Sequence, residues 1–142
     1  MNVANLLTTK GQPAVTIRPA QSVSDAVSVL AEKGLGALVV VDQEGRPIGI
    51  VTERHIVRRL AADREVLIRT VGEIMSRDLL TATPQDELSA VLHLMTERRI
   101  RHMPVLDGNA LAGIVSLGDV LRFQRDQYRG KADTLETRIV GP

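Results

Sequence analysis

The 142-residue sequence contains no cysteine and no tryptophan, and its aromatic residues are Phe123 and Tyr128. The absence of cysteine excludes disulfide bonds, thiolate metal sites and a cysteine nucleophile. The scarcity of aromatic rings leaves no stacking platform for single-stranded nucleic acid. The core must therefore be built from aliphatic side chains.

The chain also lacks a dominant charge and a long apolar run. Its formal net charge is +1 at pH 7, so no general attraction to nucleic acid or to an anionic membrane is expected. No apolar stretch approaches the roughly 20 residues of a membrane-spanning helix, and the N-terminus has no signal-peptide pattern. We therefore expect a cytoplasmic protein without membrane contact. Nucleic-acid binding, which would be salt-sensitive, stays open as an alternative because of a loose arginine group: Arg54, Arg58, Arg59, Arg64 and Arg69.

The sequence repeats itself after 65 residues. Pro84 follows Pro19 at this spacing, and so do the apolar positions of a helix: Val23, Ala26, Val27 and Leu30 return as Leu88, Val91, Leu92 and Met95. The stretches GIVTERH (49–55) and GIVSLGD (113–119) are 64 residues apart, because the turn before the second is one residue shorter. A unit of this size buries too little surface alone, so the two copies are expected to pack together.

Each copy shows the order strand, helix, strand, strand, helix. The first helix is expected to begin after Ser22 and to end at Gly34, and Thr52 is expected to open the second. Residues 1–12 show no clear period. The expected strands are Ala14–Ile17, Leu38–Val41, Pro47–Val51, Leu80–Ala82, Met103–Leu106 and Leu111–Val115, and a short helix is expected at Gly72–Met75.

The most informative polar residues lie where the last strand runs into the last helix. Ser116 and Asp119 are three residues apart at this junction. The first N–H groups of a helix have no partners within it and carry positive potential, so a phosphate can bind there. A carboxylate one turn in can accept hydrogen bonds from a diol. The same pair also matches a helix-capping box, which needs no ligand.

These features resemble a tandem pair of CBS domains, also called a Bateman module. The resemblance is carried by the two Gly-Ile-Val-Thr/Ser junctions and by GALVVVD (36–42), VGEIMS (71–76) and IRHMPVLD (100–107). It covers residues 8 to 128 and is strongest to short bacterial stand-alone CBS-pair proteins. It implies one repeat at 8–66, a second at 67–128 and a C-terminal tail at 129–142.

The resemblance implies an α/β fold of the α+β type, with two β-α-β-β-α repeats packed sheet to sheet around a pseudo-twofold axis. It further implies a regulatory module that binds an adenine-containing ligand (AMP, ADP, ATP, NAD or S-adenosylmethionine) between the repeats and requires no cofactor. Such pairs commonly form a disc-shaped homodimer and act on a further protein, which the sequence does not identify. The alternative is a purely structural dimerisation module with vestigial clefts.

By the same resemblance, the second repeat supplies the main nucleotide site. Ser116 and Asp119 would hold phosphate and ribose, and basic residues before the Met-Pro strand would contact phosphate. The residues expected in this site are Thr81, Ala82, Thr83, Arg101, His102, Met103, Pro104, Ser116, Leu117, Gly118 and Asp119.

The first repeat departs from the family pattern. His55 stands where an aspartate is expected, and Val39 replaces a proline. A neutral imidazole offers one donor and one acceptor, so it cannot hold both ribose hydroxyls as a carboxylate does. We therefore expect a weaker second cleft, lined by Thr16, Ile17, Gly36, Ala37, Thr52, Arg54 and His55.

Other polar residues are interpreted as structural. Arg98 and Arg99 are expected to be a charged helix end, which is favourable at a C-terminus. The three histidines lack metal-ligand spacing, so no metal site is expected. IMP dehydrogenase contains a CBS pair, but its thiol chemistry needs a cysteine that this sequence lacks. We therefore expect no catalytic residues and no enzymatic activity.

Overall fold

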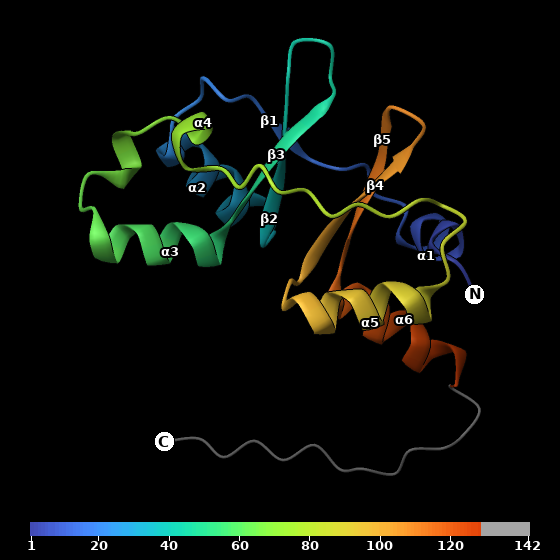
Figure 1. The fold of residues 1–142 in the computed structure, drawn as a ribbon. Helices are drawn as coiled ribbons and strands as arrows, with labels where there is room; N and C mark the ends of the chain where they lie inside the picture. The colour runs from blue at the N-terminus through green and yellow to red at the C-terminus, as the bar shows by residue number, and fades with distance from the viewer. Residues whose placement is uncertain (129–142) are drawn as a thin grey trace, which may run out of the picture.

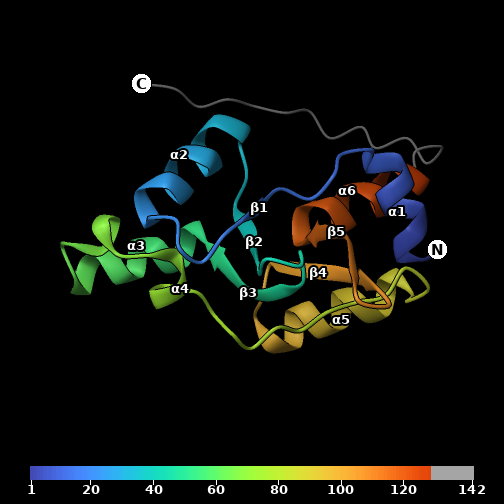
Figure 2. The ribbon, with the colours of Figure 1, turned by 90° about the horizontal axis from the view of Figure 1, so that it is seen from above.

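The computed structural model describes residues 1–128, and the predicted tail at 129–142 lies outside the described residues. The chain forms two lobes with a small sheet in each, as expected for a mixed α+β fold. Figure 1 shows the two lobes next to each other, and Figure 2 shows the strands toward the middle with the helices outside them.

The first lobe contains a three-stranded sheet in the order β1-β2-β3. The strand β1 is parallel to β2, and β2 is antiparallel to β3. All five residues of β2 are buried, which explains its continuous apolar sequence. The elements of this lobe are β1 (Thr16–Ile17), α2 (Val23–Lys33), β2 (Ala37–Val41), β3 (Pro47–Thr52), α3 (Glu53–Ala62) and a 3-10 turn, η1 (Val66–Ile68).

The predicted ends of α2 are confirmed. The Ser22 hydroxyl accepts a hydrogen bond from the Asp25 N–H at 3.0 Å, which caps the helix. Gly34 ends α2 with φ 63°, a left-handed conformation that glycine adopts without a side-chain clash.

The second lobe contains α5 (Leu88–Arg98), the antiparallel pair β4 (His102–Asp107) and β5 (Ala110–Ser116), and α6 (Leu117–Gln127). The predicted strand Leu80–Ala82 is wrong, because only an isolated parallel bridge between Ala82 and Val105 forms there. Directly after this bridge, the Thr83 N–H donates to the Asp86 carboxylate and Pro84 has no N–H to donate. The chain therefore leaves the sheet after one residue.

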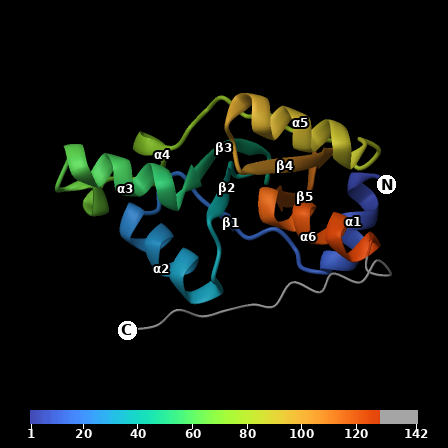
Figure 3. The same ribbon diagram turned by 90° about the horizontal axis from the view of Figure 1, so that it is seen from below.

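A helix that the sequence did not predict, α1 (Val3–Lys10), begins the chain. Asn2 and Asn5 form a reciprocal capping box at its start. Although α1 precedes the first repeat, it lies against the second lobe beside α6 (Figures 1 and 3). Val3 and Leu6 are buried in the core of that lobe.

A second short helix, α4 (Val71–Ile74), shows the same exchange in the opposite direction. It precedes the second repeat, yet Val71, Ile74 and Met75 are buried in the core of the first lobe. We call α1 and α4 the lead helices. Each lobe therefore completes its core with the lead helix of the other repeat, so the division at residues 66 and 67 describes chain order and not packing.

Two strand glycines make room for side chains of the lead-helix segments, Met75 at the end of α4 and Leu7 in α1. A Cβ atom added at Gly49 would lie 2.5 Å from Met75 Sδ and 3.0 Å from the Ser76 carbonyl oxygen. A Cβ atom added at Gly113 would lie 2.8 Å from Leu7 Cδ2. The two glycines occupy equivalent positions in β3 and β5, so a bare backbone is required at both.

The helices of the described region are all too short or too polar to cross a bilayer.

We expect Gly49→Ala to destabilise the fold by about 1–3 kcal/mol, since the new methyl group overlaps both a side chain and a rigid carbonyl. Gly113→Ala should cost less, because only the flexible end of Leu7 must move. Gly118→Ala, in the first turn of α6, is the control and should be neutral or slightly stabilising. Urea unfolding of the three variants measures this order, and equal effects at Gly49 and Gly118 would contradict it.

Candidate functional site

A cavity of about 390 Å³ opens between the two lobes, within the range of small-molecule sites. Three segments build it: the end of β3 with the first turns of α3, the linker at 76–80, and residues 99–104, which lead from α5 into β4. Its lining residues are Gly36, Ile50, Thr52, Glu53, Arg54, His55, Arg58, Ser76, Asp78, Leu79, Leu80, Arg99, Ile100, Arg101, His102 and Pro104.

Main-chain hydrogen bonds hold these segments in place. The linker is fixed to β3 because Ile50 and Ser76 exchange two hydrogen bonds, of 3.0 and 2.9 Å. The start of α3 is fixed to the residue that precedes β2, since the Glu53 N–H donates to the Gly36 carbonyl at 3.0 Å. The cavity is therefore walled by rigid backbone on the side of the first lobe.

The cavity combines positive charge with aliphatic walls. Four arginines (Arg54, Arg58, Arg99 and Arg101) face two carboxylates, which leaves a formal excess of two positive charges. The start of α3 adds the positive potential of the helix dipole, although the Glu53 and His55 N–H groups are already engaged by the Gly36 carbonyl and the Thr52 hydroxyl. Between the charges lie apolar side chains, without any aromatic ring: Ile50, Leu79, Leu80, Ile100 and Pro104. The arrangement suits a ligand that has an anionic end and a flat apolar part.

Thr52 and His55 form the helix start inside this cavity. The Thr52 hydroxyl accepts a hydrogen bond from the His55 N–H at 3.1 Å and so caps α3, as predicted. Burial lowers the pKa of His55, and the charges of Arg59 and Arg58 lower it further. The imidazole is therefore neutral at pH 7 and can act as both donor and acceptor toward a ligand.

His102 lies against the main chain of Gly36. A Cβ atom at Gly36 would be 2.9 Å from His102 Nε2 and 3.5 Å from Glu53 Oε1, so glycine is needed for this contact. Burial lowers the pKa of His102, although the nearby carboxylates of Glu53 and Asp119 oppose the shift. The His102 imidazole thus lies within electrostatic reach of two carboxylates, that of Glu53 at the start of α3 and that of Asp119 at the start of α6.

Asp119 is held by three groups of its own chain. Its Oδ2 atom accepts hydrogen bonds from Lys10 Nζ at 2.8 Å and from the Ser116 N–H at 3.0 Å. Its Oδ1 atom accepts from Arg122 Nη2 at 3.0 Å. Burial raises the pKa of Asp119, but the hydrogen bonds from Lys10 and Ser116 outweigh burial and the pKa is lowered. The capping-box interpretation of Ser116 and Asp119 is confirmed.

The structure regroups the residues of the expected main site. Arg101, His102 and Pro104 line the cavity on the Thr52 side, together with Gly36, Thr52, Arg54 and His55 of the cleft that was expected to be weaker. The other expected residues do not line it: Thr16, Ile17, Ala37, Thr81, Ala82, Thr83, Met103, Ser116, Leu117, Gly118 and Asp119. The cavity thus brings together three residues expected in the main site and four expected in the weaker cleft, and the assignment of nucleotide contacts to either site stays a prediction.

The regrouping has a physical reason in the linker. Ser76 of the linker pairs with Ile50 of β3, so the linker places residues 76–80 over the start of α3. At the equivalent position of β5, the Ile114 carbonyl accepts a hydrogen bond from Lys10 Nζ at 3.0 Å instead. The ammonium group thus joins the main chain of β5 to the carboxylate of Asp119.

Several lining residues were missed by sequence reasoning. Arg99 was interpreted as a plain helix end, yet it lines the cavity. One signal could have identified it, because Arg99 follows Gly34 by the repeat spacing and stands where a helix-ending glycine is expected. Four further lining residues belong to motifs that carry the family resemblance but were not assigned to a site: Ile50, Glu53, Ser76 and Ile100. The remaining ones carried no site signal of their own: Arg58, Asp78, Leu79 and Leu80.

We expect the Lys10–Asp119 pair to stabilise the fold, because both side chains are less than a quarter exposed. Lys10→Met should cost about 1–2 kcal/mol at pH 7, since it leaves a half-buried carboxylate with fewer donors. In a double-mutant cycle with Asp119→Asn, urea unfolding should show a clear coupling energy. The exposed Arg125–Asp126 pair is the control and should show almost none. Equal coupling energies in the two pairs would contradict a stabilising role for Lys10.

We expect His102 to make the fold sensitive to mild acid. Its pKa lies below the ordinary 6.5 in the folded protein, so the unfolded chain binds more protons as the pH falls through that region. The stability that His102 contributes is complete above pH 6.5 and is lost as the pH falls through the lowered pKa. His102→Gln should therefore flatten the fall in unfolding free energy between pH 7 and pH 5. His93→Gln, at a side chain that is 79% exposed, is the control, and an unchanged slope in His102→Gln would refute the assignment.

Comparison with known proteins agrees with this architecture. A CBS-domain family profile matches residues 3–62 and 71–126. The mitochondrial CBS domain-containing protein CBSX3 of Arabidopsis thaliana is 36% identical over 125 residues, which is 84% of this chain and 61% of that protein. The chain spans 32% and 61% of the length of the first two curated relatives that it matches.

Two solved structures extend the agreement to three dimensions. The CBS-domain containing protein ATU1752 from Agrobacterium tumefaciens superposes with a TM-score of 0.84 at 34% identity, over 87% of this chain and 99% of that chain. The CBS domain pair of protein MJ0100, in complex with 5'-methylthioadenosine and S-adenosyl-L-methionine, gives a TM-score of 0.79 at 26% identity, over 89% and 98%. With two matched domains, a shared fold and a cavity between the repeats, the chain belongs to the CBS-domain family and is a tandem CBS pair.

Proposed function

We propose that this CBS pair is a non-catalytic regulatory module that binds an adenine nucleotide in the cavity at the start of α3. The observation that carries the proposal is the cavity itself, which joins a capped helix N-terminus, an excess of arginine and aliphatic walls. A structural neighbour that is 26% identical holds two adenosine derivatives. That likeness supports an adenosine ligand for this chain also.

The lining residues suggest an orientation for the nucleotide. The base would lie between aliphatic side chains such as Leu80 and Ile100, because no aromatic ring is available for stacking. Within the described chain, no main-chain hydrogen bond joins Leu80 to another residue, so its N–H and C=O are available to the edge of a purine. The phosphates would face the start of α3 and the arginines. Asp78 and Glu53 are the carboxylates at hand for ribose hydroxyls.

Ligand binding would act on the relation between the two lobes. The cavity wall takes α3 from the first lobe and residues 99–104 from the second, so a bound nucleotide contacts both. A ligand that fits one arrangement of the lobes better than another shifts the population toward it. Such a shift would be passed to a partner protein.

We also propose a homodimer as the working assembly. Apolar side chains are exposed on the outer helices of both lobes, including Val57 at 66% and Leu121 at 50%. Exposed apolar side chains on helices of both lobes support a surface that another chain covers. A cytoplasmic location and the absence of catalysis belong to the same proposal. The described residues contain no group of three or more His, Asp or Glu side chains placed to hold a metal ion.

The proposal predicts binding by calorimetry and a thermal shift with members of a panel of AMP, ADP, ATP, NAD and S-adenosylmethionine. A ligand at 100 times its dissociation constant should stabilise the fold by about 2.7 kcal/mol. Arg101→Ala should weaken nucleotide binding about tenfold, whereas Arg64→Ala, an exposed arginine outside the cavity lining, should not. Asp119→Asn should leave the affinity unchanged.

The outcomes separate the two candidate roles. Lack of any shift at millimolar ligand would favour the purely structural dimerisation module. A large loss of affinity in Asp119→Asn, with Arg101→Ala unaffected, would move the site to the start of α6.

A further inference from the structure

Arg99 has a backbone conformation that is unfavourable for arginine. It ends α5 with φ 55° and ψ 40°, in the left-handed region. Among the residues that the structure describes, it is the only non-glycine with a positive φ. In this region the Cβ atom crowds the backbone, so the position carries strain that a glycine would relieve.

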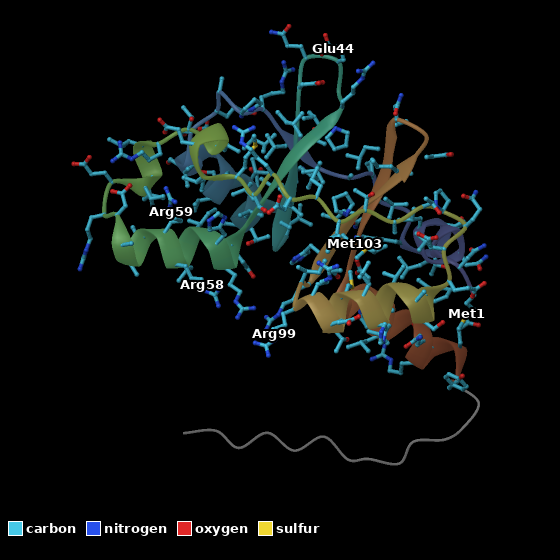
Figure 4. All side chains as sticks on the ribbon, in the orientation of Figure 1. Met1, Glu44, Arg58, Arg59, Arg99 and Met103 are labelled. Atoms are coloured by element: carbon cyan, nitrogen blue, oxygen red, sulfur yellow. The ribbon has the colours of Figure 1, made fainter. Side chains whose placement is uncertain are left out.

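The first repeat shows the relaxed form of the same helix end. Gly34, 65 residues earlier, ends α2 with φ 63° and ψ 40°. The two helix ends share one backbone geometry, but one has the favoured residue and the other does not. Strain of this kind is retained where a side chain is needed for function. Figure 4 shows the Arg99 side chain extending toward the gap between the lobes, where it lines the cavity.

Arg99 shares the cavity lining with a second arginine, from the other lobe. Arg58 lines the same cavity and projects from α3 toward the same gap (Figure 4). It lies one turn after Arg54, so it stands about 6 Å further from the helix start along the axis. Arg54 and Arg101 thus flank the helix N-terminus, and Arg58 and Arg99 lie beyond them.

None of these four guanidinium groups forms an ion pair with a carboxylate of the described chain. Within residues 1–128, the arginines that form ion pairs with carboxylates are Arg69, Arg122 and Arg125. Four unpaired cations around one cavity repel one another unless an anion joins them. A single phosphate at the helix start could engage the inner pair but would leave the outer pair without a partner.

We propose that the cavity selects nucleotides that carry a chain of two or more phosphates, with Arg99 and Arg58 as the residues that bind the phosphates farthest from the ribose. The inference rests on the proposed nucleotide-binding function and specifies its ligand class. A nucleoside diphosphate or triphosphate supplies the negative charge that the outer pair requires. S-adenosylmethionine, with a cationic sulfonium, is disfavoured by the same charges.

Calorimetry at one fixed salt concentration tests the proposal. Wild-type protein should bind ATP or ADP at least tenfold more tightly than AMP, and S-adenosylmethionine most weakly. Arg99→Gly should reduce ATP affinity about tenfold and change AMP affinity less than twofold. It should also raise the melting temperature by about 4 °C, since the strain at the helix end is removed. This combined gain of stability and loss of ATP affinity is not expected of a purely structural arginine.

Three controls sharpen the test. Arg58→Ala should reduce the preference for ATP over AMP in the same way, whereas Arg98→Ala, one residue from Arg99 and outside the cavity lining, should not. Inorganic tripolyphosphate should bind more weakly than ATP, and equal binding would overturn the nucleotide part of the inference. Equal affinities for AMP and ATP, or an unchanged ratio in Arg99→Gly, would overturn the inference and leave the proposed function standing. Failure of every adenine ligand to bind would overturn both.

Discussion

The exchange of lead helices between the lobes is the constraint on which the rest of the structure depends. Leu7 of α1 packs over the bare backbone of Gly113, and Met75 at the end of α4 packs over Gly49. The sheet of each lobe is thus covered by the lead helix of the other repeat. Neither lobe is therefore built from one repeat alone. The chain crosses between the lobes after each lead helix, and the cavity between the lobes has walls that belong to both.

The exchange also makes the two clefts unequal. After α4, the linker pairs with β3 and carries Asp78 into the cavity that His55 lines. After α1, the chain instead directs Lys10 to the carboxylate of Asp119. On the first side Asp78 and a neutral imidazole line the same cavity, and on the second side a lysine forms an ion pair with Asp119. The Asp119 carboxylate already accepts from three donors, which leaves it little capacity for a diol. The cavity lies on the other side, where His55 departs from the family pattern.

Local features of both the fold and the site were predictable because they depend on neighbours in sequence. The caps at Ser22, Thr52 and Ser116 are hydrogen bonds over three residues, and the buried strand β2 is a run of apolar residues. The repeat spacing and its motifs led to the tandem CBS fold. Helix α1 was missed because its short apolar pattern has meaning only against the second lobe. The sequence around Ala82 likewise predicts a strand, but only a single bridge to Val105 forms there, because pairing depends on residues that are distant in the chain.

The sequence by itself thus determined the duplicated α+β scaffold, the helix starts and the aliphatic core, since these follow from spacing and composition. Only the tertiary structure decided which helix start faces a cavity, because that depends on where the linker and α1 pass after the exchange. It also placed Arg99 of one lobe and Arg58 of the other in the lining of the same cavity. Contacts between residues that are distant in the chain depend on how the lobes are joined, and no local pattern encodes that geometry.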